Sequence, residues 1–116
     1  MKQYTKTHEW VEIRDGFAYV GISKFAADEL GEVVYVSLPE EGQEVNAGEP
    51  FCEIESVKAV AEVNSPVCGV VRKVNETLAD APETVNQNPD EWICAVEYTA
   101  LADNLMSEAE YAASLE

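Results

Sequence analysis

A single lysine between two runs of β-forming residues is the position around which chemistry could be organised. Lys58 lies in the segment 56–59, between the strand candidates 51–55 and 60–63. A connection this short places the lysine at the exposed tip of a hairpin. A lysine in a turn is more often only a solvated charge, and its ammonium is a poor nucleophile. Any reactive group at Lys58 must therefore be attached to it. A protruding tip with apolar neighbours can be recognised by a modifying enzyme.

Few other residues offer catalytic chemistry. His8 is the only histidine, and an isolated histidine is more often a structural or surface residue than half of a Cys–His dyad. The chain has no Gly-x-Gly-x-x-Gly and no phosphate-binding loop. With 23 Asp and Glu residues, close carboxylate pairs arise by chance, so none is assigned as an acid–base pair. We predict no catalytic residue and no metal site, and the chain does not look like an enzyme by itself.

Length and charge narrow the class of protein. The 116 residues suit one domain spanning 1–116, and the hydrophobic content of 47% is typical of a folded chain. Seven Lys and Arg residues against 23 Asp and Glu leave a net charge of −16. Such a charge disfavours nucleic acid and membrane surfaces as partners. It favours a monomer that is steered toward basic surfaces on other proteins.

The cysteines and the apolar runs indicate a compartment. No stretch reaches the roughly 20 apolar residues that span a bilayer, and no secretory signal is visible at the N-terminus. Cys52, Cys68 and Cys94 form no Cys-x-x-Cys pair. Such thiols are expected to be reduced and to pack as small hydrophobic side chains. We expect a bacterial cytoplasmic protein.

Short β-forming runs with Gly and Pro punctuation predict a mainly β fold with short helices. Asp15-Gly16 marks a hairpin turn. Ser23 caps a short helix that ends before Gly31, and the apolar face of this helix is Phe25, Ala26 and Leu30. The segment 75–90 is loop-like, with room for one helical turn. The segments 42–45 and 69–74, which each begin with glycine, have a weak two-fold similarity in sequence. The expected strands are 10–13, 17–22, 33–38, 44–45, 51–55, 60–63, 69–74 and 92–98.

The C-terminus has the signature of a helix start. Ser107 followed three residues later by Glu110 forms a capping box, and Met106 and Tyr111 occupy the two positions of a hydrophobic staple. We therefore predict a helix that runs to about Leu115.

The residues around the lysine resemble a known motif. Glu55-Ser56-Val57-Lys58-Ala59 is similar to the lipoylation motif of the glycine cleavage system H protein family. The similarity extends in order over nearly the whole chain. It includes Tyr4 to Val11, Val20-Gly21-Ile22, Leu30 to Pro39, Ala47-Gly48-Glu49, Asn64 to Val67, Val74-Asn75-Glu76, Pro82 to Asn86 and Met106 to Tyr111.

This resemblance implies a fold, a cofactor and partners. The fold would be a barrel-sandwich hybrid of the biotinyl/lipoyl type, with lipoate in amide linkage on Lys58. A lipoyl ligase or transferase would attach the cofactor. The arm would carry an aminomethyl group from the pyridoxal-phosphate glycine decarboxylase to the tetrahydrofolate-dependent aminomethyltransferase, and dihydrolipoamide dehydrogenase would reoxidise it. Tethering turns diffusion among three sites into the swing of one arm.

The family also buries the loaded arm in a cleft of its own surface. By position, Thr7, Glu9 and Glu62 would be the polar groups of this cleft, and a carboxylate suits a cationic aminomethyl group. The alternative for both glutamates is an ordinary surface role among 23 acidic residues. For Trp10 we favour core packing beside the first hairpin.

The chain departs from the family at a few positions, and other functions stay open. The loop 88–91 before Trp92 is short and lacks glycine, the three cysteines replace small or aliphatic residues, and Glu29 stands where relatives can have histidine. The altered loop motivates an H-like paralogue that relays lipoate outside glycine cleavage. A biotin carrier is more distant, because Val57 and Ala59 replace the methionines that flank its lysine. The last alternative is an acidic β-domain without a prosthetic group.

Overall fold

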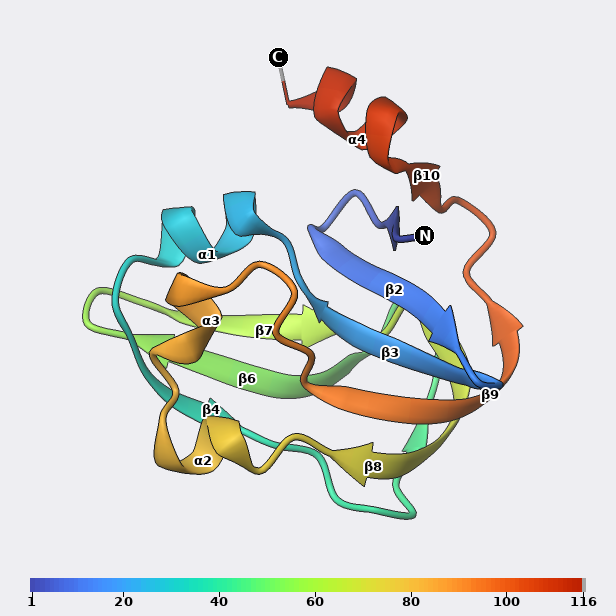
Figure 1. Ribbon diagram of the computed structural model, residues 1–116, viewed down its shortest axis with the longest axis horizontal. Helices are drawn as coiled ribbons and strands as arrows, with labels where there is room; N and C mark the ends of the chain where they lie inside the picture. Colours follow the sequence, from blue (N-terminus) through green and yellow to red (C-terminus); the bar gives the residue numbers. More distant parts are fainter. Residues whose placement is uncertain (116) are drawn as a thin grey trace.

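Two antiparallel β-sheets enclose one core in the computed structural model, which describes residues 1–115 (Figure 1). A seven-stranded sheet has the order β10-β1-β2-β3-β9-β8-β5, and a three-stranded sheet has the order β4-β6-β7. The strands are β1 Gln3–Tyr4, β2 Glu9–Arg14, β3 Phe17–Ile22, β4 Val33–Ser37, β5 Glu44–Val45, β6 Pro50–Ser56, β7 Val60–Asn64, β8 Val67–Val74, β9 Cys94–Leu101 and β10 Met106–Ser107. The predicted mainly β architecture is confirmed.

The first hairpin forms where the sequence predicts it. β2 pairs with β3 from Glu9↔Ile22 to Arg14↔Phe17. The two turn residues between them, Asp15 and Gly16, have φ values of 51° and 84°. Positive φ at both central positions defines the turn whose twist matches that of paired strands, and it explains the Asp-Gly pair.

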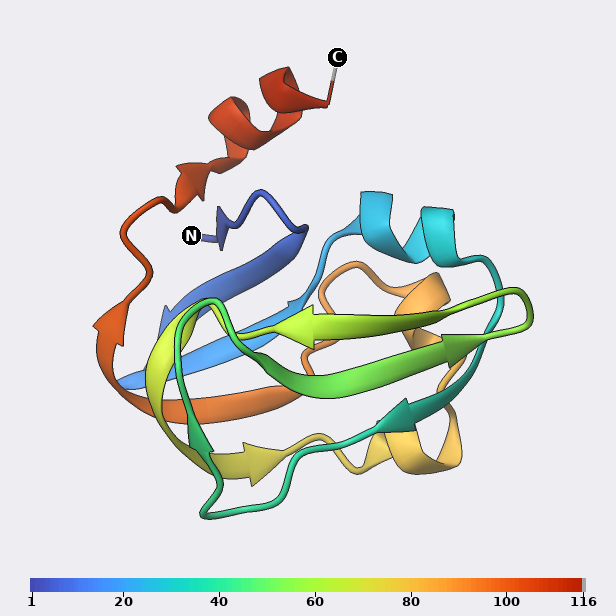
Figure 2. The same cartoon turned by 180° about the vertical axis from the view of Figure 1, so that it is seen from behind.

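The weak similarity between segments 42–45 and 69–74 has a structural counterpart. β5 pairs with β8 through Glu44↔Val70 and Val45↔Gly69, so the strand before the central hairpin meets the strand after it. Along the chain, the β6–β7 hairpin lies between these two strands, and Lys58 belongs to the turn at its far end (Figure 2). The closure of β5 on β8 therefore fixes the base from which the lysine is presented.

Residues 1–115 contain four helices: α1 Lys24–Leu30, α2 Thr77–Asp80 and α3 Thr84–Gln87 lie between strands, and α4 Glu108–Ser114 follows β10. α1 begins as predicted, because the Ser23 side chain accepts the N–H of Ala26, and Gly31 follows at φ 77°. Its buried face was predicted only in part: Leu30 is buried and Ala26 packs against the core as expected, but Phe25 does not. Ala27 and Leu30 are buried, whereas Phe25 is 37% exposed. The seven-residue helix lies against the sheets through Ala27, and Phe25 is free to line a surface cavity.

The segment 75–90 holds more structure than expected, since α2 and α3 each form one helical turn. Their buried residues, Leu78 and Val85, insert into the core, and this packing stabilises turns that propensity alone would not. The last strand begins at Cys94 rather than Trp92 and continues to Leu101.

The C-terminal helix is held by the predicted capping box. Ser107 accepts the N–H of Glu110, and Glu110 accepts the N–H of Ser107. The pairing of β1 with β10, which anchors this end of the chain, was not predicted. The pairing joins segments from opposite ends of the chain, Gln3 with Ser107 and Tyr4 with Met106, and no local pattern indicates such a contact. No helix among residues 1–115 combines the length and hydropathy that a membrane crossing needs.

The core divides into a main cluster between the sheets and a smaller cluster of Tyr4, Trp10 and Tyr111. Trp10 is fully buried, which confirms that it packs in the core. Cys52 and Cys94 are buried and free, as predicted, whereas Cys68 is half-buried. Burial raises the pKa of the Cys94 thiol to about 12 and also raises that of Cys52. Both thiols are therefore neutral packing groups at physiological pH.

Gly21 provides a test of the packing around Trp10. A Cβ at position 21 would lie 2.6 Å from two ring carbons of Trp10 and 2.8 Å from the carbonyl oxygen of Glu91. We expect Gly21→Ala to lower the free energy of unfolding by about 1–3 kcal/mol, the usual cost of overpacking, in urea denaturation. The control is Gly16→Asn, because a Cβ there meets nothing within 4 Å and asparagine tolerates positive φ. Equal stability of the two variants would contradict the packing argument.

Candidate functional site

The turn that carries Lys58 is ordered by the side chain of Ser56. The backbone N–H of Ser56 donates to the carbonyl oxygen of Ala59 at 2.8 Å. The Ser56 hydroxyl oxygen accepts the N–H groups of Lys58 and Ala59 at 3.3 Å and 3.1 Å. Ser56 is buried, whereas Val57, Lys58 and Ala59 are exposed. The turn thus has satisfied backbone groups and an outward lysine. The side chain of Lys58 forms no ion pair within residues 1–115.

The lysine side chain lies along the corner between α1 and β4. A Cβ built at Gly31 would lie 3.3 Å from Cε and 3.9 Å from Nζ of Lys58. The N–H of Val57 donates to the carbonyl oxygen of Glu32 at 3.0 Å, which ties the tip to this corner. The glycine leaves room for the alkyl chain of Lys58.

Asn86 holds the corner from the other side. Its amide nitrogen donates to the carbonyl oxygen of Gly31 at 2.7 Å, and its amide oxygen accepts the N–H of Val33 at 2.9 Å. One side chain from α3 therefore satisfies backbone groups on both sides of the α1–β4 connection. Asn86 was part of the resemblance, but its role depends on a contact with residues more than 50 positions away, which no local pattern indicates.

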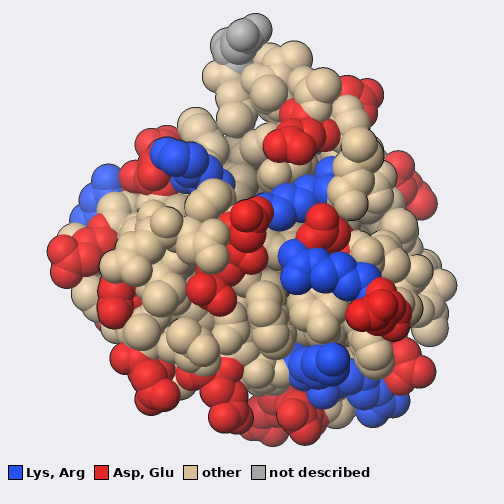
Figure 3. All heavy atoms as spheres, in the orientation of Figure 1, with Lys and Arg blue, Asp and Glu red and all other residues tan. Residues whose placement is uncertain are grey.

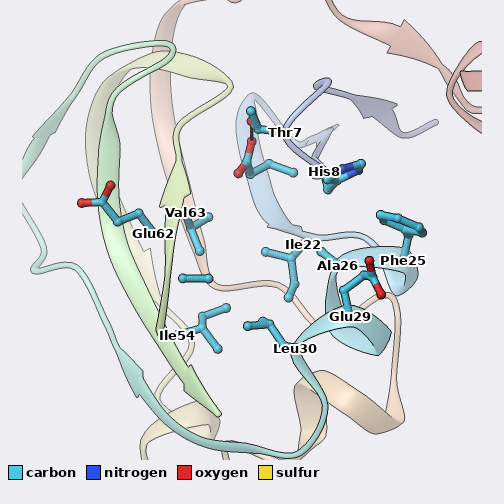
Figure 4. A pocket seen from close by; sticks show the side chains of 12 residues that line it. Thr7, His8, Ile22, Phe25, Ala26, Glu29, Leu30, Ile54, Glu62 and Val63 are labelled. Carbon is cyan, nitrogen blue, oxygen red and sulfur yellow. Dashed lines mark hydrogen bonds between the residues drawn. The ribbon is translucent and has the colours of Figure 1, made fainter. Parts of the chain in front are cut away.

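A cavity of about 310 Å³ opens beside this corner, between α1 and the two sheets (Figure 4). Its lining is mostly apolar and includes Leu30, the residue before Gly31. The polar groups come from the loop before β2 and from the rim. The lining residues are Thr7, His8, Glu9, Ile22, Phe25, Ala26, Glu29, Leu30, Ile54, Ala61, Glu62 and Val63. Sequence reasoning named only the polar members Thr7, Glu9 and Glu62 for this site.

Glu9 is the buried carboxylate of the cavity. It is 2% exposed and forms no ion pair within residues 1–115. Its Oε1 accepts the hydroxyls of Thr5 at 2.6 Å and Thr7 at 2.5 Å, and its Oε2 accepts the N–H of Asn64 at 3.2 Å. These neutral donors satisfy the oxygens without neutralising the charge. The alternative of an ordinary surface carboxylate is therefore wrong for Glu9.

Glu62 is placed differently from Glu9. Strand alternation buries Val63 and leaves Glu62 exposed. Figure 4 shows the Glu62 carboxylate directed away from Ile22 and Leu30, although the residue borders the cavity. Glu29 contributes an exposed carboxylate on the α1 side of the rim. The structure therefore brings Thr7 and Glu9 into contact and keeps Glu62 at the edge.

His8 forms a wall of the cavity. The sequence alone indicated only a structural or surface role for this histidine. It has φ 77°, a conformation that few non-glycine residues adopt. Its Nδ1 lies 2.7 Å from the hydroxyl of Tyr111, and its ring lies 4.7 Å from that of Phe25 between centroids. The Tyr111 hydroxyl also lies 2.7 Å from Oγ of Ser23, the cap of α1. The C-terminal helix thus positions the histidine.

The short loop 88–91 lies away from the cavity, and none of its residues contributes to the lining. Lys2 forms an ion pair with Asp90, and Asn75 donates to Glu91 and to the carbonyl oxygen of Trp92. The loop is therefore fixed without a glycine. Within residues 1–115, no cluster of His, Cys, Asp and Glu could hold a metal ion.

Comparison with known proteins agrees with this geometry. The family described as "Glycine cleavage H-protein" matches residues 2–116. The glycine cleavage system H protein of Rubrobacter xylanophilus is 50% identical over 115 residues, which cover 97% of this chain and 90% of that protein. The protein of the same name from Bacillus velezensis is 48% identical over 113 residues, 94% of this chain and 89% of that one.

A solved structure has the same fold. The crystal structure of a glycine cleavage system H protein from Mycobacterium marinum superposes with a TM-score of 0.93 and 37% identity. The superposition covers 98% of this chain and 95% of the other. The predicted barrel-sandwich architecture, with short helices and a C-terminal helix, is confirmed.

Removal of one hydroxyl tests the link between α4 and His8. Tyr111→Phe keeps the ring stacked on Tyr4, whose centroid lies 4.4 Å away, but removes the hydrogen bonds to His8 and Ser23. We expect a loss of about 1 kcal/mol or more in the free energy of unfolding, because buried partners are left unsatisfied. Tyr35→Phe is the control, since this exposed tyrosine makes no hydrogen bond through its hydroxyl within the described chain. Similar losses in both variants would contradict the proposed link.

Proposed function

Because the chain belongs to the glycine cleavage H-protein family, we propose that it carries lipoate in amide linkage on Lys58 and shuttles the aminomethyl group of glycine. The group would come from the pyridoxal-phosphate glycine decarboxylase and pass to the tetrahydrofolate-dependent aminomethyltransferase. Dihydrolipoamide dehydrogenase would reoxidise the carrier. The H protein is a carrier and not a catalyst, which agrees with the scarcity of catalytic residues in the sequence.

The position of Lys58 is the observation that carries this proposal. Lys58 is exposed at the end of the β6–β7 hairpin, and its turn is held by Ser56. A modifying enzyme can surround such a tip without unfolding the chain. The motif residues have distinct parts in this arrangement. Ser56 orders the turn, Val57 anchors it to Glu32, Glu55 lies in β6 before the turn, and Ala59 directly precedes β7.

The cavity beside Lys58 suits the alkyl chain of a lipoyl group. Its apolar lining suits an alkyl chain, and the corner at Gly31 leads from Lys58 to Leu30 at the cavity edge. When bound, the dithiolane supplies a redox-active pair of sulfur atoms that can hold a one-carbon unit. The residues of the cavity would bind this arm, shield it from water and neutralise the charge of the group it carries.

Glu9 and Thr7 suit the polar end of such a loaded arm. An aminomethyl group is cationic, and Glu9 offers a buried carboxylate that lacks a cationic partner in residues 1–115. Charge-assisted hydrogen bonds are about twice as strong as neutral ones. Thr7 orients the carboxylate. Glu62, whose carboxylate is exposed at the rim, would act only from the edge of the cavity.

Free buried thiols and strong acidity support the remaining expectations. Cys52 and Cys94 are unpaired and buried, which fits a reducing compartment such as the bacterial cytoplasm. The net charge of −16 favours a monomer through self-repulsion. The same charge favours basic docking surfaces on the partner enzymes.

Intact mass tests the attachment of lipoate. Wild-type protein co-expressed with a lipoyl ligase and supplied with lipoate is expected to gain the mass of one lipoyl group. Lys58→Ala should gain none, whereas Lys24→Ala, which removes another exposed lysine, should be modified as fully as wild type. Unmodified wild type, or a gain that persists without Lys58, would overturn the carrier proposal.

The same material separates a glycine cleavage component from the H-like paralogue. Lipoylated protein supplied to glycine decarboxylase should support exchange between glycine and bicarbonate. Full lipoylation without exchange would favour a lipoate relay outside glycine cleavage, the alternative motivated by the altered loop before Trp92.

Glu9 and Glu62 can be tested as a matched pair. In lipoylated protein loaded with the aminomethyl group, Glu9→Gln should speed release of the group by about tenfold, since the loss of about 1.4 kcal/mol of charge interaction corresponds to that factor. Glu62→Gln removes an equal charge at the rim and should change the rate little. Release can be followed as formaldehyde or ammonia. Equal release rates for wild type and Glu9→Gln would contradict the proposed interaction of Glu9 with the loaded arm.

A further inference from the structure

The C-terminal helix α4 depends largely on one side chain for its position on the body of the protein. Of its residues Glu108–Ser114, only Tyr111 is buried, and the other six are exposed. The helix projects from the upper edge of the molecule in Figure 3. Because a helix this short has little stability of its own, its position follows from what Tyr111 contacts.

Tyr111 contacts different segments through its ring and through its hydroxyl. The ring stacks on that of Tyr4 in β1, with 6° between the two planes. The hydroxyl lies 2.7 Å from Nδ1 of His8 and 2.7 Å from Oγ of Ser23. The stacked ring attaches the helix to β1, whereas the hydroxyl reaches beyond β1 to the loop before β2 and to the cap of α1.

Three hydrogen bonds close a ring among His8, Ser23 and Tyr111. The backbone N–H of Ser23 donates to the carbonyl oxygen of His8 at 2.9 Å, and the Tyr111 hydroxyl bridges the side chains of the same two residues. Burial raises the pKa of the Tyr111 phenol, and the charge of Glu9 adds to this rise. The bridging group is therefore a neutral hydroxyl, and it joins α4 to the loop before β2 and to the start of α1.

His8 determines how the residues on either side of it are directed. Side chains of an extended strand alternate between two faces, yet Thr7, His8 and Glu9 all line the cavity. The φ of 77° at His8 breaks this alternation and turns the chain between its two neighbours. Such a conformation is unfavourable for a residue with a side chain and persists only where surrounding contacts hold it. The hydrogen bonds of His8 to Ser23 and Tyr111 are such contacts.

The loop before β2 connects His8 to the carboxylate of Glu9 through Thr5. The N–H of His8 donates to the carbonyl oxygen of Thr5 at 3.1 Å, and the N–H of Thr5 donates to the carbonyl oxygen of Glu9 at 2.9 Å. The Thr5 hydroxyl accepts the N–H of Glu9 at 3.1 Å and donates to its Oε1. A displacement of His8 therefore reaches the buried carboxylate through one intervening residue.

The imidazole ring of His8 also supports the apolar wall of the cavity. Figure 4 shows the rings of His8 and Phe25 side by side, and both residues line the cavity. Phe25 is exposed, so its contact with the His8 ring helps to hold it at the wall. His8 thus contacts the polar loop and the apolar wall of the same cavity.

We propose that Tyr111 is a positioning residue for the loaded arm and that, through His8, it holds Thr7 and Glu9 where the cationic end of the arm binds. This inference rests on the carrier function proposed above, and it assigns control of arm retention to the C-terminal helix. Among the described residues, the cavity lining does not include Tyr111, so Tyr111 acts only through the residues that it bonds.

Hydrogen exchange of single amides in the unlipoylated protein, followed by NMR, tests this positioning before any arm is attached. Tyr111→Phe should speed exchange at Thr5, His8 and Asn64, whose N–H groups donate to residues 5–9, by about threefold more than at the slowest core amides. Val71→Ala is the control, because it truncates a buried side chain of β8 that does not line the cavity. It should show the opposite pattern, with faster exchange at the slowest core amides and wild-type exchange in the loop, since loop amides exchange through local opening.

Release of the aminomethyl group from lipoylated protein provides the second test. Tyr111→Phe and His8→Asn should each speed release by about threefold, the factor expected for one lost hydrogen bond. Asparagine is chosen at position 8 because it tolerates positive φ. The double variant should release the group no faster than the faster single variant, because both changes remove the same contact. Val71→Ala should keep the wild-type release rate although it is less stable.

The outcomes separate this proposal from the carrier function. Selective loop exchange in Tyr111→Phe, together with non-additive release rates, supports the positioning role. Wild-type loop exchange in folded Tyr111→Phe, or additive effects in the double variant, would overturn that role and leave the carrier function intact. Wild type that gains no lipoyl group would overturn the carrier function and, with it, the retention of an arm.

Discussion

The buried carboxylate of Glu9 connects the parts of this protein on which the site depends. It begins β2 in one sheet, accepts the N–H of Asn64 from β7 in the other sheet, and binds two threonine hydroxyls from the preceding loop. Removal of a carboxylate from water costs several kcal/mol, which excellent hydrogen-bond geometry can offset. The neutral donors make burial of Glu9 possible, and the carboxylate has no cationic partner among residues 1–115. A structural interaction between the sheets is thus also the polar end of the cavity.

The lysine tip and the cavity are connected by backbone rather than by long side chains. Asn86 satisfies groups on both sides of the α1–β4 corner, and Val57 bonds to Glu32 in the same corner. Gly31 then leaves space for the side chain of Lys58 to pass. A carrier needs a mobile arm on an immobile base, because mobility of the base would lower the effective concentration of the arm at each site. The hydrogen bonds of the tip and corner provide that base.

Many elements could be predicted because they depend on neighbours in the sequence. The Asp15-Gly16 turn, the Ser23 cap and the Ser107–Glu110 capping box each follow from the stereochemistry of a few adjacent residues. The helical turns of α2 and α3 escaped prediction because the core stabilises them through Leu78 and Val85. For the same reason, Ala27 was missed and Phe25 was wrongly expected on the buried face of α1, since a seven-residue helix is oriented by what it packs against.

The amino-acid sequence by itself determined the strands, the capped helices, the strong acidity and the exposure of Lys58. Each of these follows from local stereochemistry or from composition. Only the tertiary structure decided that Thr7 and Glu9 lie together in an apolar cavity, that Glu62 faces outward, and that Tyr111 holds His8 in the wall. It also decided, through the bulge in β4, that Val34 and Tyr35 are both exposed beside the tip. These features depend on strand register and on contacts between distant segments, and neither is encoded in a short stretch of sequence.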